Sequence, residues 1–175
     1  MGDSRTALGP LELVEGIWVV GDSGRPGGSW LEFREEGMYR RARDGDGELI
    51  PWSRIMLGIA VYVGRGYPSH GQYTVAGLLG NVPGPLRAHG RGHLDVTLRH
   101  PYGDHKLTFD RHPRAYRVGE TFLLEELLSQ VVAAKEAHRL GDPDWLGRAV
   151  GRLEPLGPWL TRRNINEAVK EACWG

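Results

Sequence analysis

The residues with the clearest chemical potential lie around Ser23, in the stretch Gly21-Asp22-Ser23-Gly24. A serine hydroxyl becomes a nucleophile when a histidine takes up its proton and an acid orients that histidine. No histidine precedes Ser23, and the sequence contains no Asp-x-x-His pair. Glycine, aspartate, serine and the proline that follows are residues that tight turns require. We therefore predict that this stretch is a hairpin loop, that the chain has no catalytic residue, and that it is not an enzyme.

Arginines on the first strands could bind an anion, because guanidinium groups pair with carboxylates and phosphates. Arg41 and Arg43 alternate along a predicted strand and share a face, which Arg40 opposes, and Arg25 lies in the preceding loop. The basic set also includes Arg34, and the acidic residues that can neutralise it are Glu32, Glu35 and Glu36. The pattern favours cross-strand ion pairs over phosphate binding. Arg25, Arg41 and Arg43 are nevertheless the candidate partner-binding residues.

Two patterns suggest metal binding, but the first lacks the spacing that it needs and the second lacks the helix. Residues 44–48 alternate carboxylates and glycines like the start of a calcium loop, but the glycine and glutamate required later in such a loop are missing. His89 and His93 have the spacing of two ligands on a helix, yet the glycines around them place them in a loop. The sequence predicts neither a metal site nor a cofactor.

The elements that position these residues are mainly strands up to about residue 118. Short β-rich runs alternate with glycine, proline, asparagine and aspartate, which is typical of antiparallel hairpins. About seven strands are predicted, at residues 11–20, 29–34, 38–43, 48–63 with an interruption near Pro51, 72–79, 93–100 and 105–110. Leu94, Val96 and Leu98 alternate with polar residues, which predicts one buried and one solvent-facing side. Residues 64–71 and 80–92 are rich in glycine and proline and are predicted loops.

From residue 119 onward the pattern becomes helical. Apolar residues at three- and four-residue spacing predict one amphipathic helix over residues 120–140, closed by Gly141. Asp142 and Pro143 begin a second, short helix. A last helix is predicted over residues 165–173 with Asn164 as its N-cap. The predicted division is residues 1–140 as a β-structure with its helix and residues 141–175 as a helical extension.

Composition limits the classes of partner. The chain has 175 residues, and its 22 basic and 22 acidic side chains cancel, which argues against binding nucleic acid through bulk charge. Cys173 is the single cysteine, so no internal disulfide can form. No stretch is apolar enough for a signal peptide or a membrane span. Arginine far outnumbers lysine, and we predict a bacterial, cytoplasmic protein that binds no nucleic acid and does not span a membrane.

Seven antiparallel strands followed by a helix resemble the pleckstrin-homology (PH-like) superfold. The stretch E-L-I-P-W-S-R-I resembles the I-P-W-x-x-I strand of bacterial PH-like domains, and H-K-L-T-F-D followed by L-L-E-E-L-L resembles their last strand and helix. The resemblance covers about residues 11–140. It implies an α+β, mainly β fold, a roll or barrel capped by the helix, and binding of proteins or peptides.

Two other resemblances lead to different functions. L-V-E-G-I-W and W-L-E-F-R-E-E-G-M-Y are similar to the early motifs of lipocalin-like barrels, which implies a small apolar ligand inside the barrel, with Trp18 across its base. The G-D-S around Ser23 resembles that of GDSL-type serine hydrolases, which are α/β enzymes.

The function that the sequence favours is a non-catalytic binding or adaptor module for a protein or peptide partner. The partner could also be a second copy of the chain, giving a homodimer. Its surface would be an exposed groove, the two predicted loops, or the tail that carries Trp145, Trp159 and Trp174. Trp145 joins the arginines above as a candidate partner-binding residue.

Overall fold

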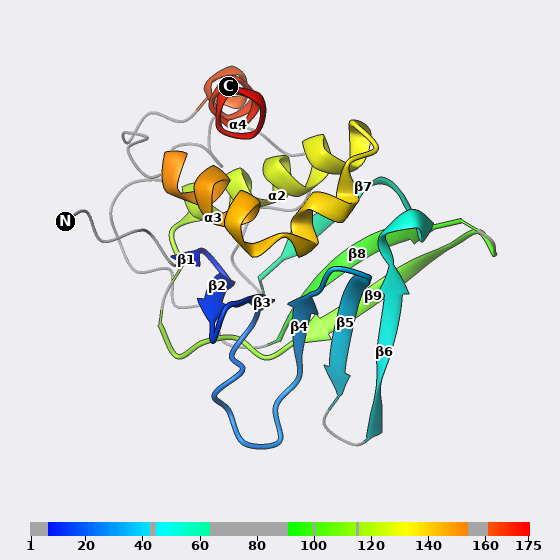
Figure 1. Cartoon of the computed structure of the whole chain (residues 1–175). Coiled ribbons are helices and arrows are strands. Elements are labelled where there is room, and N and C mark those ends of the chain that lie inside the picture. The colour runs from blue at the N-terminus through cyan, green and yellow to red at the C-terminus, as the bar shows by residue number, and fades with distance from the viewer. Residues whose placement is uncertain (1–6, 43–44, 64–90, 100, 115, 154–160) are drawn as a thin grey trace.

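The computed structural model describes residues 7–42, 45–63, 91–99, 101–114, 116–153 and 161–175. Within them the chain forms two antiparallel sheets and three α-helices, so the predicted α+β class is confirmed. Sheet A contains β1 (Ala7–Leu8), β2 (Leu11–Val14), β3 (Ile17–Val20), β4 (Trp30–Phe33), β5 (Gly37–Ala42) and β6 (Gly45–Pro51) in that order. Sheet B contains β7 (Ile55–Tyr62), β8 (Gly92–Leu98) and β9 (Gly103–Phe109), and the helices are α2 (Val118–Ala133), α3 (Pro143–Arg152) and α4 (Arg162–Trp174). Figure 1 shows the helices on one side of the molecule, with the hairpins of β4, β5 and β6 extending to the opposite side.

The predicted strand over residues 11–20 is in fact two strands. Glu15 and Gly16 both have a positive φ, of 50° and 84°. Two consecutive residues with positive φ are typical of a two-residue hairpin turn, and Leu13 pairs with Trp18 across it. The prediction of a single strand is wrong because the turn has glycine only at its second position, with glutamate where asparagine, aspartate or glycine is usual.

The chain leaves sheet A at Pro51, where the sequence predicts an interruption. A 3-10 turn, η1 (Trp52–Arg54), follows Pro51, and β7 then begins the second sheet. Proline has no backbone N–H and cannot extend a strand ladder at that position. The buried Trp52 fixes this corner, because its indole Nε1 donates a 2.8 Å hydrogen bond to the carbonyl of Arg34.

Sheet B follows the predicted alternation. Leu94, Val96 and Leu98 of β8 are buried, while the residues between them are partly exposed. β7 contains a bulge around Leu57, which has a φ of 66°. The strand predicted over residues 72–79 lies outside the described residues.

The two sheets are not closed into a barrel, because no strand of the described residues pairs across them. They meet where the backbone N–H of Asp110, just after β9, donates a 2.7 Å hydrogen bond to the carbonyl of Ser29, just before β4. Elsewhere Nε2 of His105 in β9 lies 3.5 Å from Oε1 of Glu48 in β6, a side-chain contact without a strand ladder. The predicted barrel is therefore wrong, because η1 carries the chain into a separate sheet and the edges of β6 and β9 stay apart.

The predicted helix over residues 120–140 ends earlier, at Ala133. Lys135 has a φ of 62°, which ends the α-helix. The backbone N–H groups of Lys135 and Glu136 donate to the carbonyls of Val132 and Val131 at 2.9 and 3.0 Å. This is the Schellman arrangement, here with lysine where glycine is usual. A 3-10 turn, η2 (Ala137–Gly141), completes the predicted length.

The next two helices start at polar capping residues. Asp142 caps α3 as predicted, with its Oδ1 accepting the N–H groups of Asp144 and Trp145, both at 3.0 Å. α4 begins earlier than predicted, because Thr161 is its N-cap and accepts the N–H of Asn164 at 3.1 Å.

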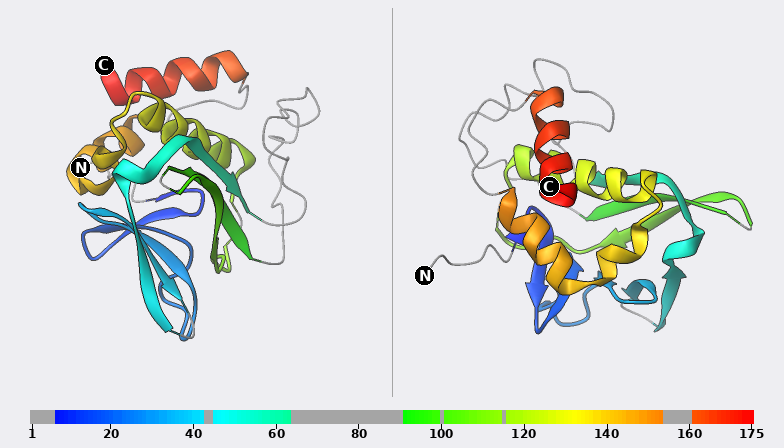
Figure 2. Two further views of the ribbon diagram at one scale, coloured as in Figure 1. Left: turned by 90° about the vertical axis from the view of Figure 1, so that its right-hand side faces the viewer. Right: turned by 45° about the horizontal axis from the view of Figure 1, so that its top comes forward.

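The helices share one hydrophobic core with the sheets. α2 packs against β7, and its buried Glu125 accepts the backbone N–H of Val61 at 2.9 Å. α4 packs on α2 and α3, as both views of Figure 2 show. The indole Nε1 of Trp18 in β3 donates a 3.1 Å hydrogen bond to the carbonyl of Pro143 in α3. None of the described helices is long and apolar enough to cross a membrane.

Candidate functional site

A hollow of about 400 Å³ opens at the end of sheet A that lies away from the helices. Its walls are the β3–β4 loop and the hairpin of β5 and β6, and we call it the loop–hairpin hollow. The residues that line it are Ser23, Gly24, Arg25, Pro26, Gly27, Gly28, Trp30, Arg41, Ala42 and Gly47. The structure thus brings together Arg25 and Arg41, two of the residues predicted to bind a partner, and adds the indole of Trp30.

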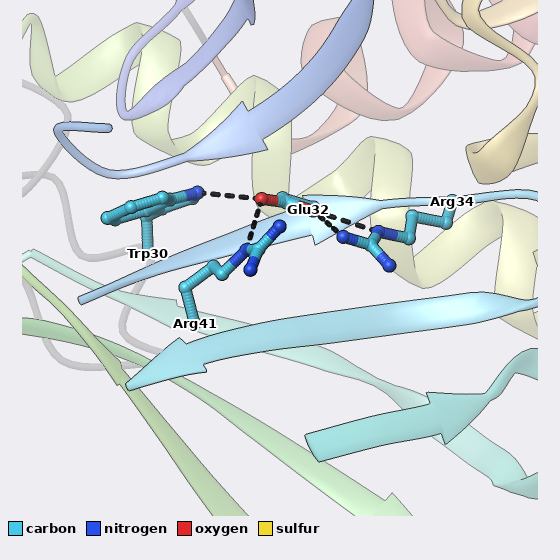
Figure 3. Close-up of polar contacts among 4 residues, drawn as sticks. All are labelled: Trp30, Glu32, Arg34 and Arg41. Carbon is cyan, nitrogen blue, oxygen red and sulfur yellow. Dashed lines mark hydrogen bonds and ion pairs between the residues drawn. The ribbon is translucent and has the colours of Figure 1, made fainter. Parts of the chain in front are cut away.

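A buried carboxylate organises one wall of this hollow. Oε1 of Glu32 accepts hydrogen bonds from Nε1 of Trp30 at 3.1 Å and from Nε of Arg41 at 2.9 Å. Oε2 accepts from Arg34, through Nε at 2.8 Å and also through Nη2. Figure 3 shows these groups converging on Glu32 from β4 and β5. Because one oxygen holds both Trp30 and Arg41, Glu32 fixes the two side chains relative to each other.

Sheet register explains why these residues meet. In the β4–β5 pair, Glu32 lies opposite Tyr39 and Trp30 lies opposite Arg41. Arg41 is therefore a diagonal neighbour of Glu32 on the same face, within reach of a long side chain. Arg34 and Arg41 also lie over the ring of Tyr39, at 3.9 and 5.1 Å from its centre.

The charges in this network favour an ionised carboxylate and a permanent cation. Burial alone would raise the pKa of Glu32, but hydrogen bonds from Arg41, Arg34 and Trp30 lower it overall. The hydrogen bond to Glu32 raises the pKa of Arg41. Arg41 uses Nε for this contact, and within the described residues its terminal nitrogens have no hydrogen bond. With its side chain 47% exposed, Arg41 can offer those nitrogens to a ligand.

The other wall of the hollow is a short loop with its own internal structure. The carboxylate of Asp22 accepts the N–H of Gly24 at 3.1 Å, and the N–H of Gly28 donates to the carbonyl of Arg25 at 3.0 Å. Gly21 has a φ of 100°, and a Cβ there would lie 2.9 Å from the carbonyl oxygen of Asp110. The stretch around Ser23 is therefore the predicted loop between two strands.

Ser23 lines the hollow, and no histidine of the described residues lines it with Ser23. Within the described residues the hydroxyl of Ser23 makes no hydrogen bond. His112, whose pKa is influenced by the charge of Asp22, has its ring nitrogens next to Glu12 and Tyr116, at 3.0 and 2.6 Å. Every strand pair of the described residues is antiparallel, unlike the α/β fold of GDSL-type enzymes.

The remaining predicted site residues lie elsewhere. Arg43 and most of the two predicted loops fall outside the described residues, whereas Gly92 begins β8 instead of ending a loop. Trp145 is in α3 beside Trp174, with 6.3 Å between ring centres, and Arg139 lies 5.8 and 5.5 Å from the two rings. This group lies on η2, α3 and α4 and does not line the loop–hairpin hollow.

A second hollow, of about 320 Å³, lies where sheet B meets α2. Asp95, Asp104 and Ser129 are among its lining residues, and Asp104 accepts a 2.9 Å hydrogen bond from the hydroxyl of Thr97. Among the described residues that line it there is no arginine or lysine. Among the described residues no group of three histidine, cysteine or acidic side chains could hold a metal ion.

Sequence reasoning treats Glu32 only as a neutralising charge and does not identify Trp30 or Asp110 as parts of a site. The signal for Glu32 is present in W-L-E-F-R, where three outward positions carry an indole, a carboxylate and a guanidinium. No such local signal exists for Asp110, which reaches the loop from 81 positions away. Comparison with family models, curated proteins and solved structures finds no match to this chain.

Proposed function

We propose that the protein is a non-catalytic binding module for a protein or peptide partner, with a PH-like arrangement of two sheets and a helix as its scaffold. The loop–hairpin hollow is the binding site in this proposal, and a bacterial cytoplasm is its setting. The observation that carries the proposal is Arg41, held at Nε by the buried Glu32 while its terminal nitrogens remain available beside Trp30.

The chemistry of the hollow favours an acidic segment of the partner. A guanidinium with two available nitrogens can bind a carboxylate through paired hydrogen bonds. Arg25 supplies a second cation, whose side chain is 60% exposed and, among the described residues, has only a 4.0 Å ion-pair contact, with Asp110. The indole of Trp30 adds a rigid apolar face, of the kind that contributes strongly at protein interfaces. A peptide with an aspartate or glutamate next to an apolar side chain would match all three groups.

Preorganisation supports affinity at this site. Arginine loses side-chain freedom when it binds a ligand, which weakens binding. The contact of Arg41 with Glu32 removes part of that freedom before the partner arrives. Trp30 is fixed by the same oxygen, so the cation and the ring present a fixed pair to the ligand.

The alternatives have less support. A lipocalin-like carrier needs a barrel closed around its ligand, whereas the described strands form two separate sheets. A GDSL-type hydrolase needs a base at Ser23, and the ring nitrogens of His112 face Glu12 and Tyr116.

The test is selection of peptides from a random displayed library on the full chain, followed by affinity measurement on the wild type and variants. We expect Arg41→Ala to weaken the selected peptides about ten- to hundredfold, the range of a lost charge-assisted hydrogen bond. Arg25→Ala is a second test that leaves the Glu32 network in place. Arg163→Ala is the matched control, because this residue is 84% exposed on α4, away from the hollow.

Three results would contradict the proposal. One is equal affinity of the wild type and both hollow variants for the selected peptides. Another is an equal loss in the Arg163→Ala control. The third is failure to select any peptide while vesicles containing anionic lipid bind the chain through Arg25 and Arg41, which would replace a protein partner with a membrane surface.

A further inference from the structure

The chain that connects β9 to α2 holds one wall of the loop–hairpin hollow. The carbonyl of Asp110 accepts the N–H of Asp22 at 2.8 Å, and its N–H donates to the carbonyl of Ser29 at 2.7 Å. Its Oδ2 accepts the N–H of Ser29 at 2.8 Å. These bonds fix both ends of the β3–β4 loop, so a shift of the β9–α2 connection would shift the wall that carries Arg25.

Two residues further along the connection, His112 lies between β2 and Tyr116. Its side chain is 7% exposed, and Nε2 lies 3.0 Å from Oε1 of Glu12, at an angle outside that of a regular hydrogen bond. Its Nδ1 lies 2.6 Å from Oη of Tyr116, and its backbone N–H donates to the same Oη at 2.9 Å. Because Oη accepts the backbone N–H, we assign the hydroxyl proton to the bond with Nδ1. The imidazole is then neutral, with its proton on Nε2 facing Glu12.

The surroundings of the ring favour this neutral form. The charged groups around it are Glu12 on β2, Asp22 in the β3–β4 loop, and Arg111 and Arg114 in the connection itself. Burial lowers the pKa of His112 and the charge of Arg114 acts in the same direction, while Glu12 and Asp22 oppose them with a smaller total effect.

Protonation would disrupt the contact with Tyr116. A proton on Nδ1 changes an acceptor into a donor, so Oη would face two N–H donors and its own O–H would have to point elsewhere. The tyrosine ring already has Arg111 and Arg114 over it, at 5.0 and 5.1 Å, so a new positive charge on the imidazole would lie close to two others.

We propose that His112 and Tyr116 form a pH-sensitive latch: protonation of His112 opens their contact, loosens the hold of Asp110 on the β3–β4 loop, and weakens partner binding in the loop–hairpin hollow. Only the last step rests on the proposed function, because the first two concern the loop itself. The effect is reversible and requires no bond making beyond proton uptake at Nδ1. Below the pH at which half of the His112 side chains are protonated, affinity for the partner would fall by up to about tenfold per pH unit. This is the limit for a binding equilibrium that is coupled to uptake of one proton.

The latch is tested by nuclear magnetic resonance on the isotope-labelled full chain, titrated from about pH 7.5 to about pH 5, where histidine changes charge. We expect the backbone amides of Gly28 and Ser29 to shift with the same midpoint as the ring of His112. His112→Gln should abolish that shift, and His138→Gln, at a residue 67% exposed in η2, should leave it unchanged.

A second variant covers the case in which His112→Gln does not fold. Tyr116→Phe removes the hydroxyl that donates to Nδ1, so the neutral imidazole loses a stabilising contact and the midpoint of His112 should rise. The amides of Gly28 and Ser29 should follow the new midpoint. Loop amides that keep a constant shift while His112 titrates, or that move equally in His112→Gln, would overturn the latch.

Affinity measurements separate the latch from the proposed function. With peptides selected at neutral pH, binding should weaken as His112 titrates in the wild type and stay constant in His112→Gln. Constant affinity in the wild type, together with shifting loop amides, would overturn the regulatory step. If no peptide binds at any pH while the amides still follow His112, the proposed function fails and the first two steps of the latch are supported.

Discussion

Replacing Glu32 with glutamine removes the charge that holds Trp30, Arg34 and Arg41 together. The Glu32 side chain is 9% exposed, so its carboxylate relies on these donors and not on water. Glutamine keeps one acceptor oxygen but presents an amide N–H group to a guanidinium, so at least one charge-assisted pair is lost. A hydrogen bond to a charged group contributes about 1.5–3 kcal/mol.

The exposure of the two arginines limits the loss of stability in Glu32→Gln. Arg34 and Arg41 are 33% and 47% exposed and can regain water when their partner is lost. We therefore expect Glu32→Gln to lower the free energy of unfolding by about 2–3 kcal/mol, below the ~3–5 kcal/mol of a fully buried pair. For a chain of this length this is a fall in Tm of about 4–12 °C.

The assay is urea unfolding, with Glu48→Gln as the matched control. Glu48 lies on the same sheet, its side chain is 48% exposed, and among the described residues its carboxylate contacts only His105, at 3.5 Å. An exposed pair of this kind contributes about 0–1 kcal/mol. If Glu32→Gln costs no more than Glu48→Gln at neutral pH, the carboxylate does not organise the network.

The pH dependence provides a second check. The pKa of Glu32 is lower in the folded chain than in the unfolded chain, where it is about 4.3. Its stabilisation is therefore complete above that value and is lost as the pH falls through the folded-state pKa. The difference between wild type and Glu32→Gln should shrink below about pH 4. A difference that stays constant down to about pH 2.5 would refute the ionic explanation.

Three further predictions concern the core and the loop. Gly21→Ala places a Cβ 2.9 Å from a backbone carbonyl oxygen at a φ of 100°. It should lower the free energy of unfolding, measured in urea, by about 1–3 kcal/mol. The control Gly103→Ala, with open space around its Cβ, should change stability far less. Trp18→Phe removes the 3.1 Å hydrogen bond to the Pro143 carbonyl and leaves part of a buried site empty, so we expect a loss of about 1–3 kcal/mol, and unchanged stability would contradict the packing described. Burial raises the pKa of Cys173 to about 11. Its thiol should therefore react with a disulfide reagent at about pH 8 only after the chain is denatured. Rapid reaction of the native chain would contradict this prediction, because it would show that the thiol is accessible.

The sequence by itself determined the elements that depend on local dihedral angles and on periodic burial. The alternation around Leu94, the break at Pro51 and the cap at Asp142 each act within a few residues and are readable from residue type. The sequence prediction failed where a residue adopts a backbone conformation that its type does not favour. Lys135 takes the left-handed conformation that usually belongs to glycine, and the helical periodicity gives no sign that α2 ends there.

Only the tertiary structure decided which polar groups meet. Glu32 and Arg41 share a face because of the register of β4 and β5, and a shift of one residue would separate them. Asp110 reaches Ser29, and His112 reaches Glu12, only because the end of sheet B lies against the start of sheet A. Local patterns specify burial and backbone conformation, whereas such contacts depend on how two sheets are placed relative to each other, which no short stretch of this sequence encodes.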